Sequence, residues 1–135
     1  MKSRLWYRSR GLRKMESRVG SGIVRNFIKE RLNTEKEIRV LEIGFGEGKC
    51  LLDLRVLFPQ KNVKLFGINK KKDGKMHEKI DFIKNAKSFG LKIVRDNLPK
   101  PYFYDAGDEL KFKDNFFDLV ISQVSFHYVG DKAKL

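Results

Sequence analysis

The chain of 135 residues has a single cysteine, Cys50, and three prolines. One cysteine excludes both a disulfide framework and a zinc site built from several cysteines, and we predict no metal site. No apolar run approaches the roughly 20 residues that a membrane-spanning helix needs, and the N-terminus lacks the apolar core of a secretory signal. We therefore expect a cytoplasmic protein without a membrane partner. The arginine-rich, acid-poor start keeps an organelle transit segment as an alternative.

Acidic residues are also scarce: 17 Asp and Glu face 30 Lys and Arg, which leaves a formal charge of +13. The basic excess lies mainly in residues 1–36 and 68–100, on either side of a nearly neutral, glycine-rich stretch. Hydrophobic residues make up 41% of the chain, which is too many for a disordered tail. The length allows one domain with one core. We divide the chain into a basic arm, 1–20, and a core, 21–135.

Hydrophobic periodicity predicts alternating helices and strands. Apolar residues spaced about 3.6 apart predict helices, and short β-branched apolar runs predict buried strands. The helices are expected over 20–32, 49–58 and 76–90, and the strands over 38–43, 63–68, 102–104 and 117–122. The stretch 91–100 fits a short strand or a loop equally well. This alternation is typical of an α/β domain, a Rossmann-like three-layer sandwich with a mainly parallel sheet, in which ligands bind beyond the carboxyl ends of the strands.

A glycine-rich loop, EIGFGEG at residues 42–48, directly follows the first predicted core strand. Glycines at 44, 46 and 48 would let a ligand lie against bare backbone. The amides that open the next helix can receive an anion. The same glycines could also serve only a tight turn between strand and helix.

Two common phosphate-binding patterns do not fit this loop. A P-loop requires a glycine where Ile43 stands and a hydroxyl residue where Cys50 follows Lys49. A dinucleotide fingerprint requires a glycine in place of Lys49. Glu42 and Glu47 would also repel a pyrophosphate. The loop therefore favours a ligand that carries a cation.

The match to [ED]-x-G-x-G-x-G after a buried strand resembles motif I of the class I S-adenosylmethionine-dependent methyltransferases, of a broad type-11-like group. Three further segments resemble this family in the right order: LFGINKK at 65–71, YDAGDELKFKDNFFDLVIS at 104–122 and SFHYVGD at 125–131. The resemblance covers about residues 38 to 131. It implies an enzyme that binds S-adenosyl-L-methionine.

The resemblance also implies roles for individual residues. Glu42 would help to hold the ammonium group of the cofactor, and Asn69 would accept a hydrogen bond from the ribose where the family usually has an acid. Asp105 would bind the adenine amine, and the Ala106 amide would contact the ring; Asp105 could equally be a turn residue or a helix cap. The predicted cofactor-binding residues are Glu42, Gly44, Phe45, Gly46, Gly48, Asn69, Asp105, Ala106 and Ser122.

Methyl transfer from a sulfonium disperses positive charge, so positioning matters more than acid or base chemistry. His127 is the one candidate for a general base, and a packed or loop-stabilising histidine is the alternative. Residues 122–125 lack the N-P-P-Y pattern of enzymes that methylate exocyclic amines, and no cysteine there can attack a pyrimidine. We therefore expect a small-molecule O, N or C acceptor. We assign structural roles to Asp118, at the start of a strand, and to Cys50, as a buried apolar residue.

Charge favours the alternative partner, RNA. Arginines between positions 4 and 18, interleaved with Trp6 and Tyr7, could bind phosphates and stack on bases. Lysines at 70–72 and 75 add charge near the predicted cofactor side. The alternatives are thus an RNA methyltransferase or a non-catalytic basic RNA-binding module, besides a nicotinamide-dependent oxidoreductase. A merely solvated basic surface fits the composition equally well.

The family core has seven strands, and this sequence supplies four of them before it stops at Leu135. We therefore expect the N-terminal half of the fold, incomplete at the C-terminus, either as a piece of a longer reading frame or completed by a second chain. The oligomeric state is left open. The fourth core strand is expected to form an open edge of the sheet, which is an aggregation hazard.

Overall fold

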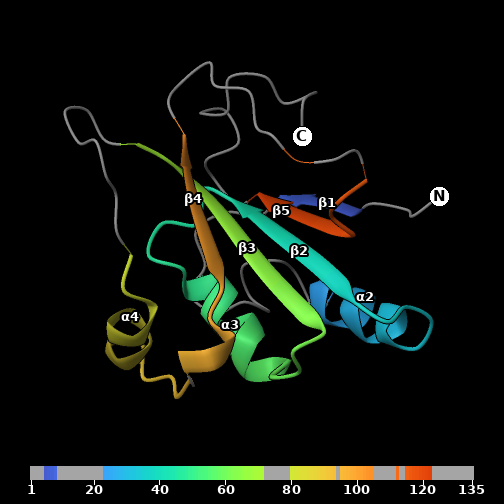
Figure 1. Cartoon of the computed structure of the whole chain (residues 1–135), viewed down its shortest axis with the longest axis horizontal. Coiled ribbons are helices and arrows are strands. Elements are labelled where there is room, and N and C mark those ends of the chain that lie inside the picture. Colours follow the sequence, from blue (N-terminus) through green and yellow to red (C-terminus); the bar gives the residue numbers. More distant parts are fainter. Residues whose placement is uncertain are drawn as a thin grey trace.

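Figure 1 shows the computed structural model of the chain as an α/β arrangement. The structure describes residues 5–8 (backbone), 23–71, 80–93, 95–104, 112 and 115–122. Its strands are β1 (Leu5–Arg8), β2 (Ile38–Ile43), β3 (Val63–Lys70), β4 (Lys100–Tyr104) and β5 (Leu119–Ser122). Its helices are α2 (Ile23–Leu32), α3 (Lys49–Leu57), α4 (Phe82–Ser88) and the 3-10 turn η1 (Arg95–Asn97).

The five strands form one sheet in the order β1-β5-β2-β3-β4, and every neighbouring pair is parallel. The expected parallel α/β, Rossmann-like fold is confirmed. Because all strands run the same way, their carboxyl ends lie at one edge of the sheet. The chain runs β2, β3, β4 in one direction and then returns to place β5 on the other side of β2. The gap between β2 and β5 is therefore the topological switch point.

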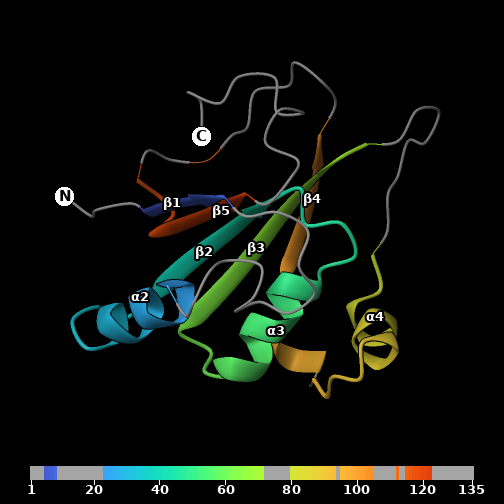
Figure 2. The same cartoon turned by 180° about the vertical axis from the view of Figure 1, so that it is seen from behind.

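All three α-helices cover the same face of the sheet. Figure 1 shows α3 behind the strands, and Figure 2, from the opposite side, shows it in front, while α4 lies to the side of β4 in both views. Their apolar residues share one core with alternate residues of the strands, because successive strand residues point to opposite faces. This core includes Val24, Ile28, Val40, Leu51, Leu52, Leu54, Leu65, Phe82, Ala86, Leu119 and Ile121. Among the described residues, no helix has the length and the apolarity to cross a bilayer.

The opposite face carries a second, smaller core rich in aromatic residues. It contains Leu41, Ile43, Phe66, Ile68, Tyr104, Phe117 and Val120, with Phe112 and Phe116 packed against them. The described part of the chain places no α-helix on this face. The described residues thus supply two of the three predicted layers.

The strand boundaries agree with expectation to within two residues: β3 ends at Lys70 rather than at 68, β4 begins at Lys100 rather than at 102, and β5 begins at Leu119 rather than at 117. The helix expected over 76–90 is described only as α4, Phe82–Ser88. Asp81 caps its N-terminus, where the carboxylate accepts a hydrogen bond from the Lys84 amide at 3.0 Å. The part of the prediction over 76–79 lies outside the described residues. Of the stretch 91–100, for which the sequence fits a short strand and a loop equally well, Arg95–Asn97 form η1, Lys100 begins β4, and the other described residues are loop.

The expectation of an open edge at the fourth core strand is wrong. Leu5–Arg8, in the segment assigned to a basic arm, forms β1 and pairs in parallel with β5. The register sets Leu5 beside Leu119 and Arg8 beside Ser122. A strand edge presents unpaired N–H and C=O groups, and any extended segment that reaches it can satisfy them. The composition of the arm indicated charge but could not show this pairing.

Candidate functional site

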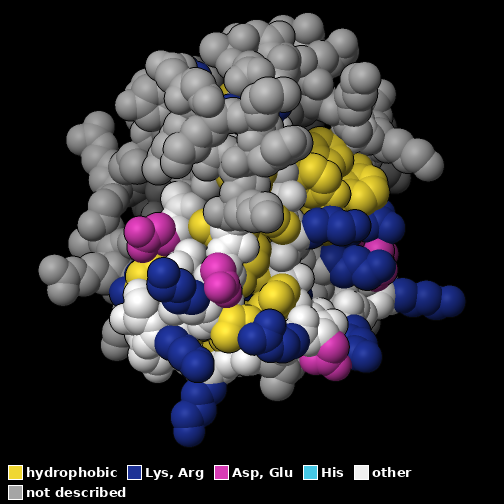
Figure 3. Space-filling model, turned by 60° about the vertical axis from the view of Figure 1, so that its left-hand side comes forward, with side chains coloured by type: hydrophobic (Ala, Val, Ile, Leu, Met, Phe, Trp, Pro, Cys, Tyr) yellow, Lys and Arg dark blue, Asp and Glu magenta, His cyan; other side chains and the backbone are white. Residues whose placement is uncertain are grey.

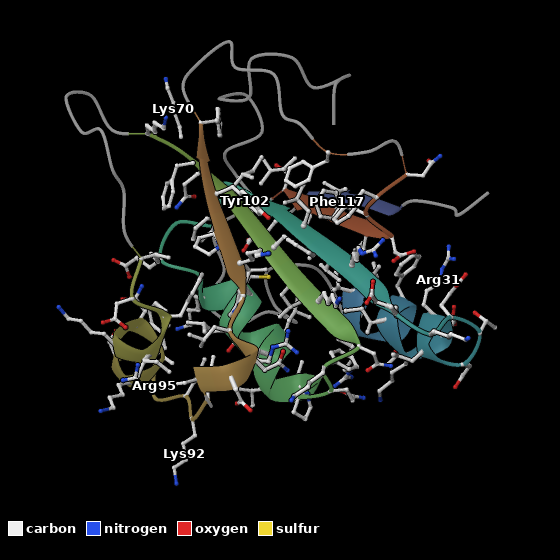
Figure 4. The ribbon with its side chains drawn as sticks, viewed as in Figure 1. Arg31, Lys70, Lys92, Arg95, Tyr102 and Phe117 are labelled. Atoms are coloured by element: carbon white, nitrogen blue, oxygen red, sulfur yellow. The ribbon has the colours of Figure 1, made fainter. Side chains whose placement is uncertain are left out.

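The candidate site lies at the carboxyl edge of the sheet, at the switch point. The glycine loop follows β2, Ser122 ends β5, and Asn69 lies near the end of β3. In Figure 4, Lys70 marks the same edge at the end of β3. This is the place at which open parallel sheets usually bind their ligands.

The loop backbone has a conformation that glycine adopts readily. Gly44, Gly46 and Gly48 have φ values of 70°, 61° and 88°, in the left-handed region. Gly44 N–H still donates to Ile68 O at 2.8 Å, so the β2–β3 ladder extends into the loop. Gly48 N–H donates to Phe45 O at 2.9 Å and closes a tight turn before α3.

Gly46 and Gly48 differ in the space around them. Gly48 is the N-cap of α3, and a Cβ added there would lie 2.6 Å from Phe82 Cε1. A Cβ at Gly46 would meet nothing within 4 Å. Gly48 therefore serves packing as well as backbone conformation, whereas the surface over Gly46 is open to a ligand.

Phe45 does not present its side chain to the site. Only 3% of its surface is exposed, and its ring lies 6.0 Å from that of Phe82 and 6.3 Å from that of Phe103. A Cβ at Gly67 of β3 would lie 2.4 Å from Phe45 Cδ1, so the missing side chain of Gly67 makes room for this ring. Phe45 anchors the loop in the core and leaves only its backbone for a ligand.

Asn69 binds the loop through both ends of its amide. Gly46 N–H donates to Asn69 Oδ1 at 2.9 Å, and Asn69 Nδ2 donates to Gly46 O at 2.9 Å. A carboxylate has no donor and could form only the first of these bonds. This pairing gives a structural reason for an amide at a position where the resemblance predicts an acid. The second lone pair of Oδ1 is still a possible acceptor for a ribose hydroxyl.

We predict that Asn69→Asp lowers the free energy of unfolding by about 1 to 2 kcal/mol, because the Gly46 carbonyl loses its donor and faces a carboxylate. Urea unfolding measures this loss, and hydrogen exchange at the Gly46 amide reports the loop directly. Asn62→Asp is the matched control, because Asn62 Nδ2 donates a single 3.3 Å bond, to Lys36 O. Equal losses in the two variants would contradict the role assigned to Asn69.

Glu42 and Ser122 are both buried, with 1% and 3% of their surfaces exposed. Glu42 lies beside Gly67 and Ile121 in the register, in alternation with Val40, and so belongs to the helix-covered face. Ser122 lies beside Ile43, on the opposite face. Within the described ranges, Ser122 Oγ has no hydrogen-bond partner. A buried carboxylate and a buried hydroxyl thus flank the glycine loop.

The remaining predicted site residues, Asp105, Ala106 and His127, lie outside the described residues. The backbone next to the first two continues the sheet edge, because Lys71 N–H donates to Tyr104 O at 2.7 Å. Burial raises the pKa of Tyr104. Its phenol is therefore neutral at pH 7.

The structural roles expected for Asp118 and Cys50 are confirmed. Asp118 Oδ2 accepts from the Arg39 amide at 2.9 Å, and the Asp118 amide donates to Arg39 O at 2.9 Å. These bonds extend the β2–β5 pairing before β5 begins. Cys50, the single cysteine of the chain, is buried inside the core.

Two residues that support the site escape sequence reasoning. Asn85 of α4 donates from Nδ2 to Glu47 O at 3.0 Å and ties the loop to a distant helix. Arg55 of α3 donates to three backbone carbonyls beyond the helix C-terminus. An arginine within a largely apolar helical run is the one sequence signal that could have identified Arg55. No sequence signal marks Asn85.

Comparison of the chain with protein-family models, with curated proteins and with solved structures finds no match.

Proposed function

We propose that this chain binds S-adenosyl-L-methionine at the glycine loop and serves methyl transfer to a small-molecule O, N or C acceptor. One observation carries the proposal. A loop of three positive-φ glycines, preceded by a buried carboxylate at Glu42, stands at the switch point of a parallel sheet. We also expect a cytoplasmic location, from the single, reduced cysteine.

The described residues suit the chemical groups of this cofactor. Glu42 offers a carboxylate for an ammonium group, and its charge disfavours a diphosphate beside the loop. The surface over Gly46 is open, and Asn69 Oδ1 keeps a lone pair for a ribose hydroxyl. Glycine amides can approach a carboxylate closely because no Cβ intervenes.

S-Adenosylmethionine supplies a methyl group on a sulfonium, which departs as a neutral thioether when a lone pair of the acceptor attacks the methyl carbon. The protein then has to orient two reactants and exclude water. The glycine loop is held by the packing of Phe45 and by the hydrogen bonds of Asn69 and Asn85, and this attachment would fix the orientation of a bound cofactor. An acceptor with a pKa far above neutral would also need a general base, for which His127 is the proposed residue.

Calorimetry with S-adenosylhomocysteine tests the proposal. We expect saturable binding to the chain and a loss of at least tenfold in affinity for Gly46→Arg, because the new side chain would fill the open surface over the loop. Gly90→Arg is the matched control. Gly90 also has a positive φ, 74°, and open space around its Cβ, but it lies after α4, away from the loop.

Loss of stability at a positive φ affects both variants alike, so the difference between them isolates the ligand. Absence of binding to the wild-type chain, or equal affinities of Gly46→Arg and wild type, would contradict the proposal. Binding of a reduced nicotinamide cofactor, detected by its fluorescence, would favour the oxidoreductase alternative instead.

A further inference from the structure

A groove lies on the face of the sheet that the described α-helices leave open. It has a volume of about 470 Å³. Its lining comes from the early parts of β2, β3 and β4, from Arg55 of α3, from the end of η1 with the segment that joins it to β4, and from Phe116. The strand residues Lys64, Phe66 and Tyr102 lie on the opposite face from the core that holds the glycine loop, whereas Arg55 and Leu65 belong to the helix-covered side, so the groove continues around the edge of the sheet. A space of this size holds a ligand comparable to one nucleotide.

Four cations line the groove: Arg39 of β2, Lys64 of β3, Lys100 of β4 and Arg55 of α3, whose guanidinium already donates to backbone carbonyls. Arg39 and Lys64 are direct neighbours in the register. Both bind one carboxylate, that of Glu37, at 2.7 Å and 2.8 Å. Four positive charges and one negative charge leave 4 − 1 = +3 around the groove. The side chain of Lys64 is still 50% exposed, so it can reach an anion in solvent.

The apolar part of the groove combines the aromatic rings of Phe66, Tyr102 and Phe116 with leucines and prolines. Tyr102 of β4 is 36% exposed. Its ring stacks with that of Phe66 at 6.4 Å between centroids and an interplanar angle of 20°. Phe112 packs edge-on against Tyr102 at 5.4 Å and holds the ring in place. Arg39 lies over the ring of Phe116 at 4.4 Å. Figure 4 shows Tyr102 on β4, and Figure 3 shows hydrophobic side chains gathered beside a group of Lys and Arg.

We propose that this groove binds single-stranded nucleic acid. One base would extend the Phe66–Tyr102 stack, and the adjoining phosphates would pair with Lys64 and Lys100. Fixed aromatic rings beside flexible cations are the combination with which proteins bind single strands without reading their sequence. An acidic peptide would use the cations but has no planar group to place on the Tyr102 ring. The charge and the stack together therefore favour a nucleic acid.

Fluorescence anisotropy with a labelled ten-nucleotide oligouridine tests this proposal. We expect binding that weakens steeply with salt. Tyr102→Ala should lower the affinity about tenfold, and Tyr102→Phe should retain it, because the stacking ring remains. Because Tyr102 packs on Phe66, Tyr102→Leu is a second variant that keeps apolar volume without a stacking ring. It should lose affinity as Tyr102→Ala does.

The cations are tested by charge-neutral variants. Lys64→Gln and Lys100→Gln should each reduce the slope of log affinity against log salt by about one. Lys92→Gln is the matched control, because Lys92 is an exposed lysine that projects away from the sheet, at the bottom of Figure 4. It removes the same charge outside the groove, and the slope should not change.

Glu37→Gln provides a test by gain of binding. It should raise the affinity severalfold at low salt, because Arg39 and Lys64 lose the carboxylate that pairs with them. Glu30→Gln, an exposed substitution on α2, makes the same change of net charge and serves as its control. Misfolding cannot imitate this outcome, because an unfolded groove does not bind more tightly.

Equal binding by the wild type and Tyr102→Leu would overturn the proposal. So would equal salt slopes for Lys100→Gln and Lys92→Gln, or competition by polyglutamate as strong as that by unlabelled oligouridine. The groove is independent of the proposed cofactor site, so Gly46→Arg should not weaken oligouridine binding; its added positive charge acts, if at all, in the opposite direction. Failure at one site is therefore distinguishable from failure at the other.

Discussion

Gly67→Ala is expected to lower the free energy of unfolding by about 3 kcal/mol, although it adds a single methyl group. The new Cβ would lie 2.4 Å from Phe45 Cδ1 and 2.8 Å from Leu51 Cδ1. Gly67 lies within β3, between β2 and β4, so neither the backbone nor these buried side chains can move away cheaply. Urea unfolding followed by circular dichroism measures the change.

A double-mutant cycle attributes this loss to Phe45. Phe45→Ala alone should cost about 3 to 5 kcal/mol, because it leaves a cavity among buried rings. In the double variant the alanine methyl would partly occupy that cavity, so the combined loss should fall short of the sum by more than about 1 kcal/mol. Gly90→Ala is the control: its Cβ would meet nothing, and its effect should add to that of Phe45→Ala. Additive losses for Gly67→Ala and Phe45→Ala would contradict the packing described above.

The contact between Gly67 and Phe45 also links the stability of the core to the glycine loop of the candidate site. Phe45 stands between two positive-φ glycines, so displacement of its ring moves the loop backbone. Gly67→Ala should therefore weaken binding at the loop as well, although Gly67 itself offers no side chain to a ligand. Gly67→Ala would then leave every proposed ligand contact in place and weaken ligand binding by displacing the Phe45 ring that holds the loop.

Arg55→Ala is the second substitution with a large expected effect, a loss of about 3 kcal/mol or more. Only 4% of Arg55 is exposed. Its Nη1 donates to Phe58 O at 2.9 Å and Gln60 O at 3.2 Å, and its Nη2 donates to Val63 O at 2.7 Å. Removal of the guanidinium takes the side-chain donor from these carbonyls, of which Gln60 O still accepts from the Val63 amide at 3.2 Å, and opens a cavity at the junction of α3 and β3.

The geometry of the guanidinium, not only its charge, should matter. Arg55→Lys keeps the positive charge, but its single ammonium nitrogen cannot reach the three carbonyls that the two terminal guanidinium nitrogens of Arg55 bind. We therefore expect a loss of stability between that of Arg55→Ala and zero. A lysine variant as stable as wild type would show instead that charge alone suffices. Thermal unfolding of the two variants beside wild type measures the difference.

Burial lowers the pKa of Arg55 to about 10. Its pKa is higher in the unfolded chain, so the unfolded state binds the proton more tightly. The contribution of Arg55 to the free energy of unfolding therefore rises as pH increases from about 10 towards the pKa of the unfolded chain. Below about pH 10 this contribution is constant. Between pH 6 and 9 the losses in Arg55→Ala should not change with pH. A loss that varied across this range would point to another titrating group.

The elements of the sheet could be predicted from local pattern. β2 begins and ends at the predicted residues, Ile38 and Ile43, because a strand buried on both faces requires a continuous β-branched apolar run. The position of the glycine loop followed from the same run, since ligand loops follow parallel strands. The boundaries of α4 were less accurate, because the cap at Asp81 competes with an apolar pattern that extends further towards the N-terminus.

The sequence by itself determined the parallel α/β class and the placement of the glycine loop, because both depend on periodicity or on neighbouring residues. Only the tertiary structure decided that Leu5–Arg8 pairs with β5, that Gly67 makes room for Phe45 and that Asn69 binds Gly46. These contacts join residues separated by more than 20 positions, and no local propensity encodes which distant partner will fill a given space or satisfy a given backbone group.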